Sequence, residues 1–430
     1  MISTKQRSNT LKVLILGSGA REHTIAWKFS KSNRISGLFI APGNAGTEEI
    51  GENLWGVDPE KSDDVIAACR ENDIDLVFVG PEAPLSVGIV DALQNEDIQV
   101  IGPHKEAARL ESSKEFSKEF MIRHGIPTAE AETVTTKKDL EKIIKQRNGK
   151  VVIKKNGLAA GKGVLESDDT DELISFGNGI LKQKDTLLVE EFLTGYEISI
   201  FTMSDGKSYS ILPPTADFKK AGEGDSGPNT GGMGAICPVP VVGKQLLADI
   251  EEKIVKPTFK GLEKDGLMYK GVLYFGLMIT EQGPKLLEYN VRFGDPECQV
   301  LLPLIESDFG DFCDAIAKGR LDSFPLSISQ KSALCVVVAS GGYPGKYSKG
   351  KKVKPLPNFP EKDCIIFHAS TKASDDHTAL TGGGRCFSVV GLGPNLTNAS
   401  VRAYEAAPQV KFDGAWFRKD IGKKFFVNNV

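Results

Sequence analysis

The stretch KLLEYNVRFGDPE, residues Lys285–Glu297, constrains the fold and the function more than any other part of the sequence. Alternate residues of a β-strand point to opposite faces. Glu288, Asn290 and Arg292 would therefore share one face of a strand, and this polar row ends at a turn, Gly294–Pro296. The opposite face carries apolar side chains that suit a core, namely Leu287, Tyr289, Val291 and Phe293.

The polar row offers a specific chemistry. The carboxylate of Glu288 and the amide oxygen of Asn290 suit a hard cation such as Mg²⁺. Arg292, two residues further on, can hold a phosphate oxygen through two hydrogen bonds. The alternative is an exposed strand face with an incidental ion pair. The tight turn that follows at once favours a site over a solvated edge.

Composition bounds the possible classes of protein. A length of 430 residues predicts about two to four domains. With 40% hydrophobic and 26% charged residues and a net charge of −4, the chain resembles a soluble globular protein and gives no reason to expect a nucleic acid or membrane partner. No apolar run suits a membrane span or a signal peptide. The seven cysteines are scattered, which indicates a reduced, cytoplasmic compartment. The five histidines show no metal-ligand spacing, which argues against a zinc site.

The N-terminal part alternates short buried strands with helices, which predicts a small doubly wound domain. Leu11–Leu16 is an apolar strand that runs into the glycine turn Gly17–His23, a typical way to offer backbone N–H groups to a phosphate. A dinucleotide fingerprint would require glycine where Glu22 stands, which argues against a nicotinamide cofactor and thus a dehydrogenase. Arg21 and Glu22 at this turn favour a polar, phosphorylated ligand, although a plain strand-to-helix turn stays possible.

Glu82 follows the buried strand Leu76–Val79. Ligands of such a domain bind outside the carboxyl ends of its strands. Glu82 could cap a helix, or it could accept hydrogen bonds from a sugar or an amine. The sequence alone leaves both roles open.

The central part contains a glycine loop after a strand. Val151–Lys155 is the strand, and Asn156–Gly163 is the loop, which carries Lys162. The spacing of this loop does not fit a P-loop, but it suits a mobile flap over a triphosphate, with Lys154 reaching in from the strand.

A second strand in this part, Leu187–Leu193, passes into a hinge whose backbone could pair with an adenine edge. Glu197, just beyond it, could hold ribose hydroxyls. The long polar segment Asp217–Gly234 reads as a glycine-rich functional loop. Near the C-terminus, Arg418 and Lys419 are equally consistent with a phosphate contact and with a solvated basic pair.

Together these motifs resemble the ATP-grasp ligases, and most closely the phosphoribosylamine–glycine ligase family. The resemblance covers nearly the whole chain and rests on seven stretches in the right order. They are GSGAREH (17–23), APGNAG (41–46), GPEAPL (80–85), GLAAGKG (157–163), GPNTGGMG (227–234), EYNVRFGDPE (288–297) and RKDIG (418–422).

The resemblance implies a fold. It is α/β and α+β multidomain, with an N-terminal doubly wound Rossmann-like substrate domain at residues 1–112. A central ATP-grasp domain would occupy residues 113–325, including a mobile flap subdomain at about 126–195. A small α+β domain would occupy residues 326–430. The implied protein is a cytoplasmic monomer.

The resemblance also implies a reaction: ATP phosphorylates glycine, and 5-phosphoribosylamine attacks the glycyl phosphate, giving glycinamide ribonucleotide, ADP and phosphate in purine biosynthesis. Glu288 and Asn290 would bind Mg²⁺ or Mn²⁺, and Arg292 and Asp295 would be catalytic. The implied ATP contacts are Lys114, Lys154, Lys162, Glu190, Glu191, Leu193 and Glu197. The implied contacts to the phosphoribosyl substrate and the reacting amine are Gly19, Arg21, Glu82, Asp295, Arg418 and Lys419.

The sequence departs from the family pattern at several positions. Ala20 stands where glycine is common, Asn156 where aspartate is common, and Ala216–Lys219 reads Ala-Asp-Phe-Lys where the family commonly has Gln-Asp-His-Lys. The last change removes two polar groups from a segment expected near the substrates. Two alternative functions stay open for the chain as a whole. It could be another ATP-grasp carboxylate–amine ligase, or a nucleotide-binding protein without turnover.

Overall fold

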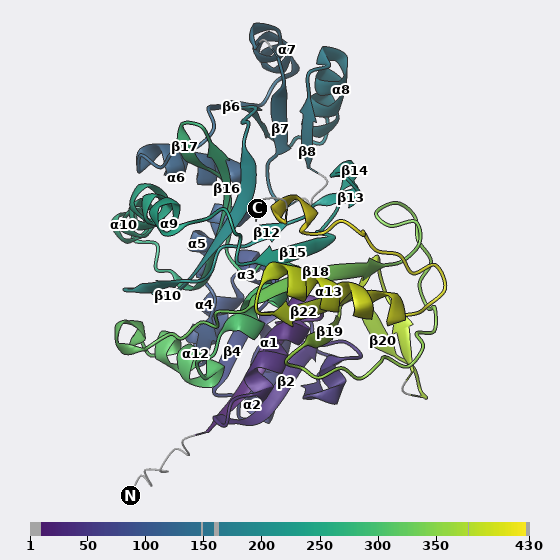
Figure 1. The fold of residues 1–430 in the computed structure, drawn as a ribbon. Coiled ribbons are helices and arrows are strands. Elements are labelled where there is room, and N and C mark those ends of the chain that lie inside the picture. Colours follow the sequence, from purple (N-terminus) through teal and green to yellow (C-terminus); the bar gives the residue numbers. More distant parts are fainter. Residues whose placement is uncertain (1–9, 148, 159–162, 377, 427–430) are drawn as a thin grey trace, which may run out of the picture.

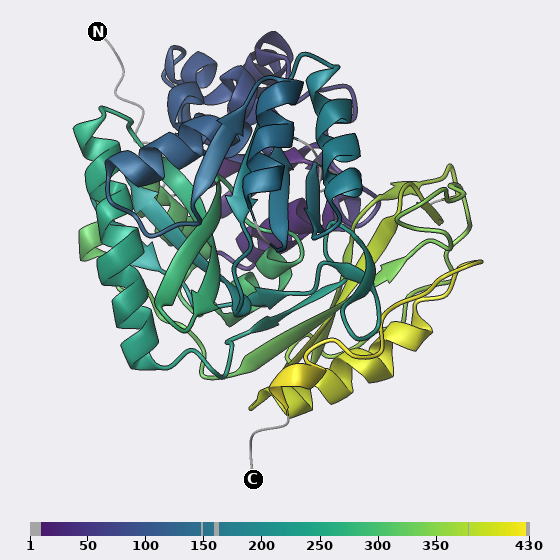
Figure 2. The same ribbon diagram turned by 90° about the horizontal axis from the view of Figure 1, so that it is seen from above.

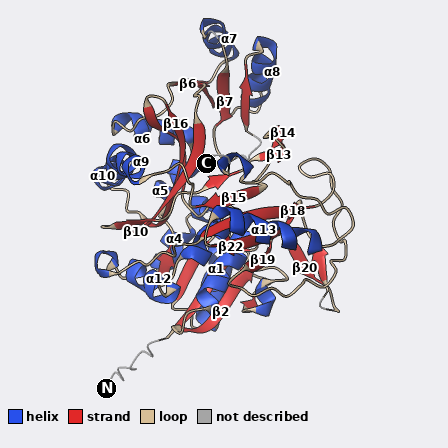
Figure 3. Cartoon of the chain, in the orientation of Figure 1, coloured by secondary structure: helices blue, strands red, loops and turns tan. Residues whose placement is uncertain are grey.

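The computed structural model describes residues 10–147, 149–158, 163–376 and 378–426 (Figure 1). Over these residues the chain has the α/β and α+β multidomain architecture expected from its sequence. Figure 3 shows several separate sheets with helices packed around them.

The N-terminal part is a parallel sheet with the strand order β3-β2-β1-β4-β5. Because the order reverses at β1, the connecting helices cover both faces of the sheet, which confirms the doubly wound prediction. The strands are β1 (Leu11–Gly17), β2 (Ile35–Pro42), β3 (Glu52–Asn53), β4 (Leu76–Val79) and β5 (Gln99–Ile101). The helices are α1 (Ala20–Ser30), η1 (Thr47–Glu49), α2 (Ser62–Glu71), α3 (Glu82–Val87), α4 (Ile89–Gln94) and α5 (Lys105–Ser112).

The central part contains two antiparallel sheets, the two halves expected of an ATP-grasp fold. The first has the order β6-β9-β7-β8 and carries α7 and α8, which stand at the top of Figure 1. Its elements are β6 (Ala131–Val134), α7 (Lys137–Gln146), β7 (Val151–Lys155), β8 (Val164–Ser167), α8 (Thr170–Leu181) and β9 (Leu187–Glu191).

The second half has the order β11-β10-β16-β17. Its strands are β10 (Tyr196–Asp205), β11 (Tyr209–Ile211), β16 (Lys270–Thr280) and β17 (Gly283–Asn290). The helices of this part of the chain are α6 (Lys114–Arg123), α9 (Lys244–Ile250), η2 (Glu251–Val255), α10 (Lys256–Lys264), α11 (Glu297–Leu301), η3 (Leu302–Leu304), α12 (Phe309–Ala317) and η4 (Leu321–Ser323).

The last sheet combines strands from the central and the C-terminal parts of the chain. Its order is β12-β15-β18-β22-β19, and α13 lies along its outer face (Figure 2). The elements are β12 (Ala216–Asp217), β15 (Gly234–Cys237), β18 (Ser332–Ala339), β19 (Cys364–His368), β22 (Arg385–Gly393), α13 (Leu396–Ala406), η5 (Ala407–Gln409) and η6 (Lys423–Phe425). A separate hairpin pairs β20 (Thr371–Ala373) with β21 (Ala379–Thr381). The domain boundaries at residues 112 and 325 stay a prediction.

Two structural details differ from the sequence expectation. The segment Asp217–Gly234 is not a plain loop, because it contains a hairpin of β13 (Lys220–Gly222) and β14 (Ser226–Asn229).

In addition, β17 carries a bulge, since Gly276 faces Glu288 while Leu277 faces Leu286. A bulge adds one residue and shifts the alternation of faces. Leu286 therefore enters the core, whereas Leu287, which we placed there, lines a cleft instead.

Aromatic side chains join the N-terminal sheet to the central part. Phe78 of β4 stacks on Phe293 with ring centroids 6.3 Å apart, and Phe29 of α1 meets Phe309 of α12 edge to face at 4.8 Å. All four side chains are buried. The segment that follows β17 is thus fixed by packing from the N-terminal sheet.

Candidate active site

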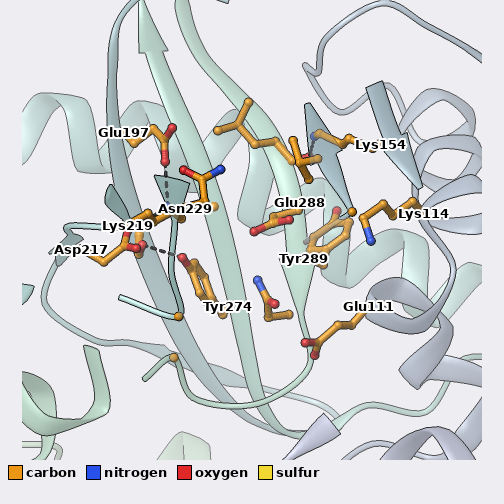
Figure 4. Close-up of a pocket in the computed structure, with 18 of the residues that line it drawn as sticks. Glu111, Lys114, Lys154, Glu197, Asp217, Lys219, Asn229, Tyr274, Glu288 and Tyr289 are labelled. Carbon is orange, nitrogen blue, oxygen red and sulfur yellow. Dashed lines mark hydrogen bonds and ion pairs between the residues drawn. The ribbon is translucent and has the colours of Figure 1, made fainter. Parts of the chain in front are cut away.

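A cleft of about 860 Å³ lies where the two central sheets, the N-terminal sheet and the C-terminal sheet meet (Figure 4). Most of the site residues expected from the sequence line this single cleft. They are Arg21, Glu82, Lys114, Lys154, Glu190, Glu191, Leu193, Glu197, Glu288, Asn290, Arg292 and Asp295.

The polar row around β17 is held from the N-terminal side. The Arg292 guanidinium lies 2.6 Å from Glu111 Oε1, 3.2 Å from Glu82 Oε2 and 3.1 Å from Asn290 Oδ1. Burial lowers the pKa of Arg292, but the two carboxylates outweigh this effect and raise it, so the guanidinium stays charged. The sequence pattern did not predict Glu111, near the end of α5; its position three residues before Lys114 is the signal that could have found it.

The row also suits a divalent cation. Glu288 and Asn290 present a carboxylate and an amide oxygen in the cleft, and the described residues contain no cluster of three His, Cys, Asp or Glu that could hold a metal. Mg²⁺ commonly takes only one or two protein carboxylates and completes its shell with phosphates and water. The donor set therefore fits an ion that arrives with a nucleotide.

Lysine side chains line the wall of the cleft opposite the polar row of Glu288, Asn290 and Arg292. Lys154 of β7 lies 2.8 Å from Glu190 Oε2, and Lys118 of α6 lies 3.0 Å from Glu190 Oε1. Burial raises the pKa of Glu190, but these two ammonium groups outweigh it and lower the pKa. Lys114 donates to Gly157 O over 2.8 Å, and burial lowers its pKa against the pull of Glu288. Lys118 escaped sequence analysis, and Lys162 lies outside the described residues.

A second charged group closes one end of the cleft. Lys219 bridges Glu197 and Asp217, with its Nζ 2.8 Å and 2.9 Å from their carboxylate oxygens (Figure 4). Glu297, the first residue of α11, lines the same cleft and is 3% exposed. Lys219 and Glu297 both lie within sequence motifs, but those motifs predicted no role for either residue.

The departures from the family pattern point away from the cleft. Along Ala216–Lys219, Asp217 and Lys219 line the cleft, while Ala216 and Phe218 are each 2% exposed and lie in the core. The Phe218 ring lies 5.6 Å from the Arg418 guanidinium and 4.9 Å from Lys424 Nζ. The two apolar residues therefore leave the polar face of this segment intact.

The N-terminal turn is tied to the polar row. Arg21 Nε lies 2.6 Å from Glu22 Oε1, and Arg21 Nη1 donates to Phe293 O over 3.0 Å. Glu22 Oε2 accepts from the backbone N–H of Gly19 at 2.6 Å. A Cβ on Gly19 would come within 2.9 Å of Glu22. Glu22, which excluded the dinucleotide motif, is thus a structural anchor of the turn.

Asp295 is held from the C-terminal sheet. Its Oδ2 lies 3.0 Å from Arg385 Nη2, and Gln299 Nε2 donates to its Oδ1 over 2.7 Å. Arg385 of β22 also donates to Gly231 O at 2.6 Å and to Asp295 O at 2.8 Å. Arg385 was not predicted as a site residue, because it follows three glycines and belongs to none of the recognised motifs.

Arg418 and Lys419 do not line the cleft. The Arg418 guanidinium is 1% exposed and donates to Lys220 O, Asp225 and Asp420 over 2.8 to 3.0 Å. Lys419 is exposed. The role of both residues in substrate binding stays a prediction.

Family models match nearly the whole chain. The phosphoribosylglycinamide synthetase N domain matches residues 11–111, the ATP-grasp (A) domain of that synthetase residues 112–298, and its C domain residues 333–424. The phosphoribosylamine–glycine ligase of Rhodopirellula baltica is 42% identical over 96% of this chain and 98% of its own length. The human trifunctional purine biosynthetic protein adenosine-3 is 43% identical over 96% of this chain, which spans 42% of that longer protein.

Solved structures agree with this match. The crystal structure of the phosphoribosylamine–glycine ligase of Thermotoga maritima has a TM-score of 0.84 and 37% identity, covering 96% of this chain and 100% of the other. A biotin carboxylase domain from Hydrogenobacter thermophilus has a TM-score of 0.73 at 15% identity, covering 95% of this chain and 92% of its own, which shows the shared fold alone. No helix in the described part of the chain is long and apolar enough to cross a membrane.

Proposed function

The chain belongs to the phosphoribosylglycinamide synthetase (phosphoribosylamine–glycine ligase) family, and we propose from this premise how its cleft ligates glycine to 5-phosphoribosylamine. ATP phosphorylates the glycine carboxylate, and the amine then displaces phosphate, giving glycinamide ribonucleotide and ADP. The observation that carries the proposal is the polar row Glu288, Asn290 and Arg292, which faces the buried cation Lys154 across one cleft.

ATP lies between the two central sheets in this proposal. The hinge at Glu190, Glu191 and Leu193 takes the adenine edge, and Glu197 takes the ribose hydroxyls. Lys114 and Lys154 contact the phosphates, joined by Lys162 from the glycine loop. The carboxylate of Glu190 supports Lys154 through their 2.8 Å contact and so acts through that lysine.

Phosphoryl transfer needs positioning and charge neutralisation more than covalent help. Glu288 and Asn290 would hold Mg²⁺ or Mn²⁺, which neutralises charge on the transferring group when it is bound. Arg292 faces the charge that grows during transfer, and Glu82 and Glu111 orient its guanidinium beforehand. Arg21, Glu82 and Asp295 contact the phosphoribosyl substrate and its amine in this proposal, together with Gly19, Arg418 and Lys419, which do not line the cleft itself.

The decisive experiment measures ADP release from the purified protein with ATP, Mg²⁺, glycine and freshly made phosphoribosylamine, omitting one component at a time. The proposal expects ADP release that requires both glycine and phosphoribosylamine. Dependence on a different carboxylate or amine would replace it with a sibling ligase. ATP binding without turnover would indicate a binding protein. The cytoplasmic location and monomeric state stay predictions.

A further inference from the structure

We propose that Asp217 and Glu297 bind the ammonium group of glycine at the end of the cleft beyond Arg292. This inference rests on the proposed ligase function, because it assumes that glycine enters this cleft. It adds two specificity-determining residues, neither of which the sequence pattern had assigned a role.

Two elements bring these carboxylates to one place. Asp217 ends β12, which pairs with β15, and Glu297 begins α11, which packs against β15. Both residues line the cleft together with Tyr274 of β16. Figure 4 labels Asp217 and Tyr274 in this cleft. The shared strand β15 therefore fixes the two acids relative to each other.

The charges at this end do not balance. Lys219 is the cation of the group, and it is already shared between Glu197 and Asp217. The nearby Arg292 is taken up by Glu82 and Glu111. Glu297 forms no ion pair and no hydrogen bond with another side chain of the described residues. Its carboxylate accepts from its own backbone N–H.

An unpaired buried carboxylate is costly unless a cation meets it. Glu297 is 3% exposed, and burial, with the charge of Asp217, raises its pKa to about 7 against the opposite effects of Lys219 and Arg292. The phenol of Tyr274 also faces the group. A ligand ammonium would supply the missing positive charge and would keep Glu297 ionised.

The position of the two acids suits a substrate as small as glycine. Arg292 and Glu297 line the same cleft, and each perturbs the pKa of the other, so a glycine whose carboxylate lies beside Arg292 can extend its ammonium toward Glu297. A Cβ on Gly294 would come 2.4 Å from Glu297 Oε2, so the lack of a side chain there lets this carboxylate sit against the backbone. The acids thus define the end of the glycine subsite.

The test compares Glu297→Gln and Asp217→Asn with wild type in steady-state kinetics, varying glycine and ATP separately. Loss of one charge-assisted contact corresponds to a rise of about tenfold or more in the glycine KM. In Glu297→Gln the KM for ATP should stay within about twofold, because Glu297 forms no ion pair or side-chain hydrogen bond with a proposed ATP contact among the described residues, whereas Asp217→Asn also frees Lys219 beside Glu197. Glu281→Gln, an exposed acid in the turn before β17, is the matched control and should leave both constants unchanged.

A pH series separates binding from a merely structural role. The wild-type glycine KM should fall as the pH rises through about 7, because Glu297 ionises there, and Glu297→Gln should lose this dependence. An unchanged glycine KM in both variants, or a fall in kcat alone, would overturn the ammonium site while leaving the ligase intact. Wild-type ADP release that ignores glycine would instead overturn the proposed function.

Discussion

At the scale of single residues, Arg292 shows how far a sequence pattern reaches. Alternation along an expected strand predicted that Glu288, Asn290 and Arg292 lie together, and all three line one cleft, although β17 ends at Asn290 and Arg292 follows it. The same rule could not find Glu111, 2.6 Å from Arg292, because that contact joins residues far apart in the chain. It misplaced Leu287 because one bulged residue shifts the alternation.

Arg292→Ala should lower kcat by about 100-fold to 1,000-fold, the usual effect of removing one preorganised donor to developing charge. The variant should still fold, but its free energy of unfolding should fall by about 1–3 kcal/mol, because Glu111 and Glu82 lose a buried partner. Single-turnover ADP formation and urea unfolding measure the two effects.

Arg123→Ala removes an exposed arginine that pairs with Asp265, and it serves as the control for both measurements. Surface ion pairs contribute about 0–1 kcal/mol. Turnover of Arg292→Ala at the wild-type rate would contradict the role given to this guanidinium.

At the scale of elements, the β13–β14 hairpin shows what a glycine-rich pattern conceals. The sequence indicated a functional loop over Asp217–Gly234 but not its hairpin, because glycine allows many backbone conformations and has no periodic signal. Arg418 of the C-terminal segment fixes the hairpin by donating to Lys220 O and pairing with Asp225. The neighbouring Lys219 is thereby held in the cleft.

Arg418→Ala should therefore disturb Lys219 indirectly. We expect kcat/KM to fall by about tenfold, since small misplacements of site groups are costly. Arg418→Lys, which keeps the charge but not the planar fork, should recover only part of this loss. Thermal unfolding and kinetics with each substrate varied provide the readouts, with the exposed Lys423→Ala as control.

The outcome also decides between two roles for Arg418. As a clamp, its loss lowers stability and impairs the use of glycine and phosphoribosylamine alike. As a direct phosphate contact, its loss would raise the KM for phosphoribosylamine alone, with thermal stability unchanged. The second result would support the substrate contact that the resemblance implies for Arg418.

At the scale of the whole molecule, the site exists because distant parts of the chain meet. Family motifs predicted the three-part fold, and most of the residues that they assigned to the site line the cleft. Arg385 was missed, although it ties the C-terminal sheet to Asp295 and Gly231. Such contacts depend on how sheets dock, and the shared β12-β15-β18-β22-β19 sheet has no local sequence signal.

The contact between the N-terminal and C-terminal parts should make the free energy of unfolding depend on pH. His23 of α1 accepts at Nδ1 from the backbone N–H of His368 in β19 over 2.9 Å, and both imidazoles are buried. Burial lowers the pKa of His23 to about 3, helped by the charge of His368, and burial lowers the pKa of His368 to about 4. Both side chains are therefore neutral in the folded protein at physiological pH.

Because the folded pKa values lie below the unfolded value of about 6.5, the unfolded chain binds the extra protons between these limits. The contribution of the two neutral histidines to the free energy of unfolding is fully present above pH ~6.5 and is lost as the pH falls toward 4. Urea unfolding between pH 4 and 8 should show this loss, and His368→Gln should flatten the dependence over that interval. His104→Gln, which changes a half-buried histidine near the surface, should leave the slope as in wild type. An equal slope in wild type and His368→Gln would assign the acid sensitivity to carboxylates, and the histidine contact would then be only a packing contact between the two parts.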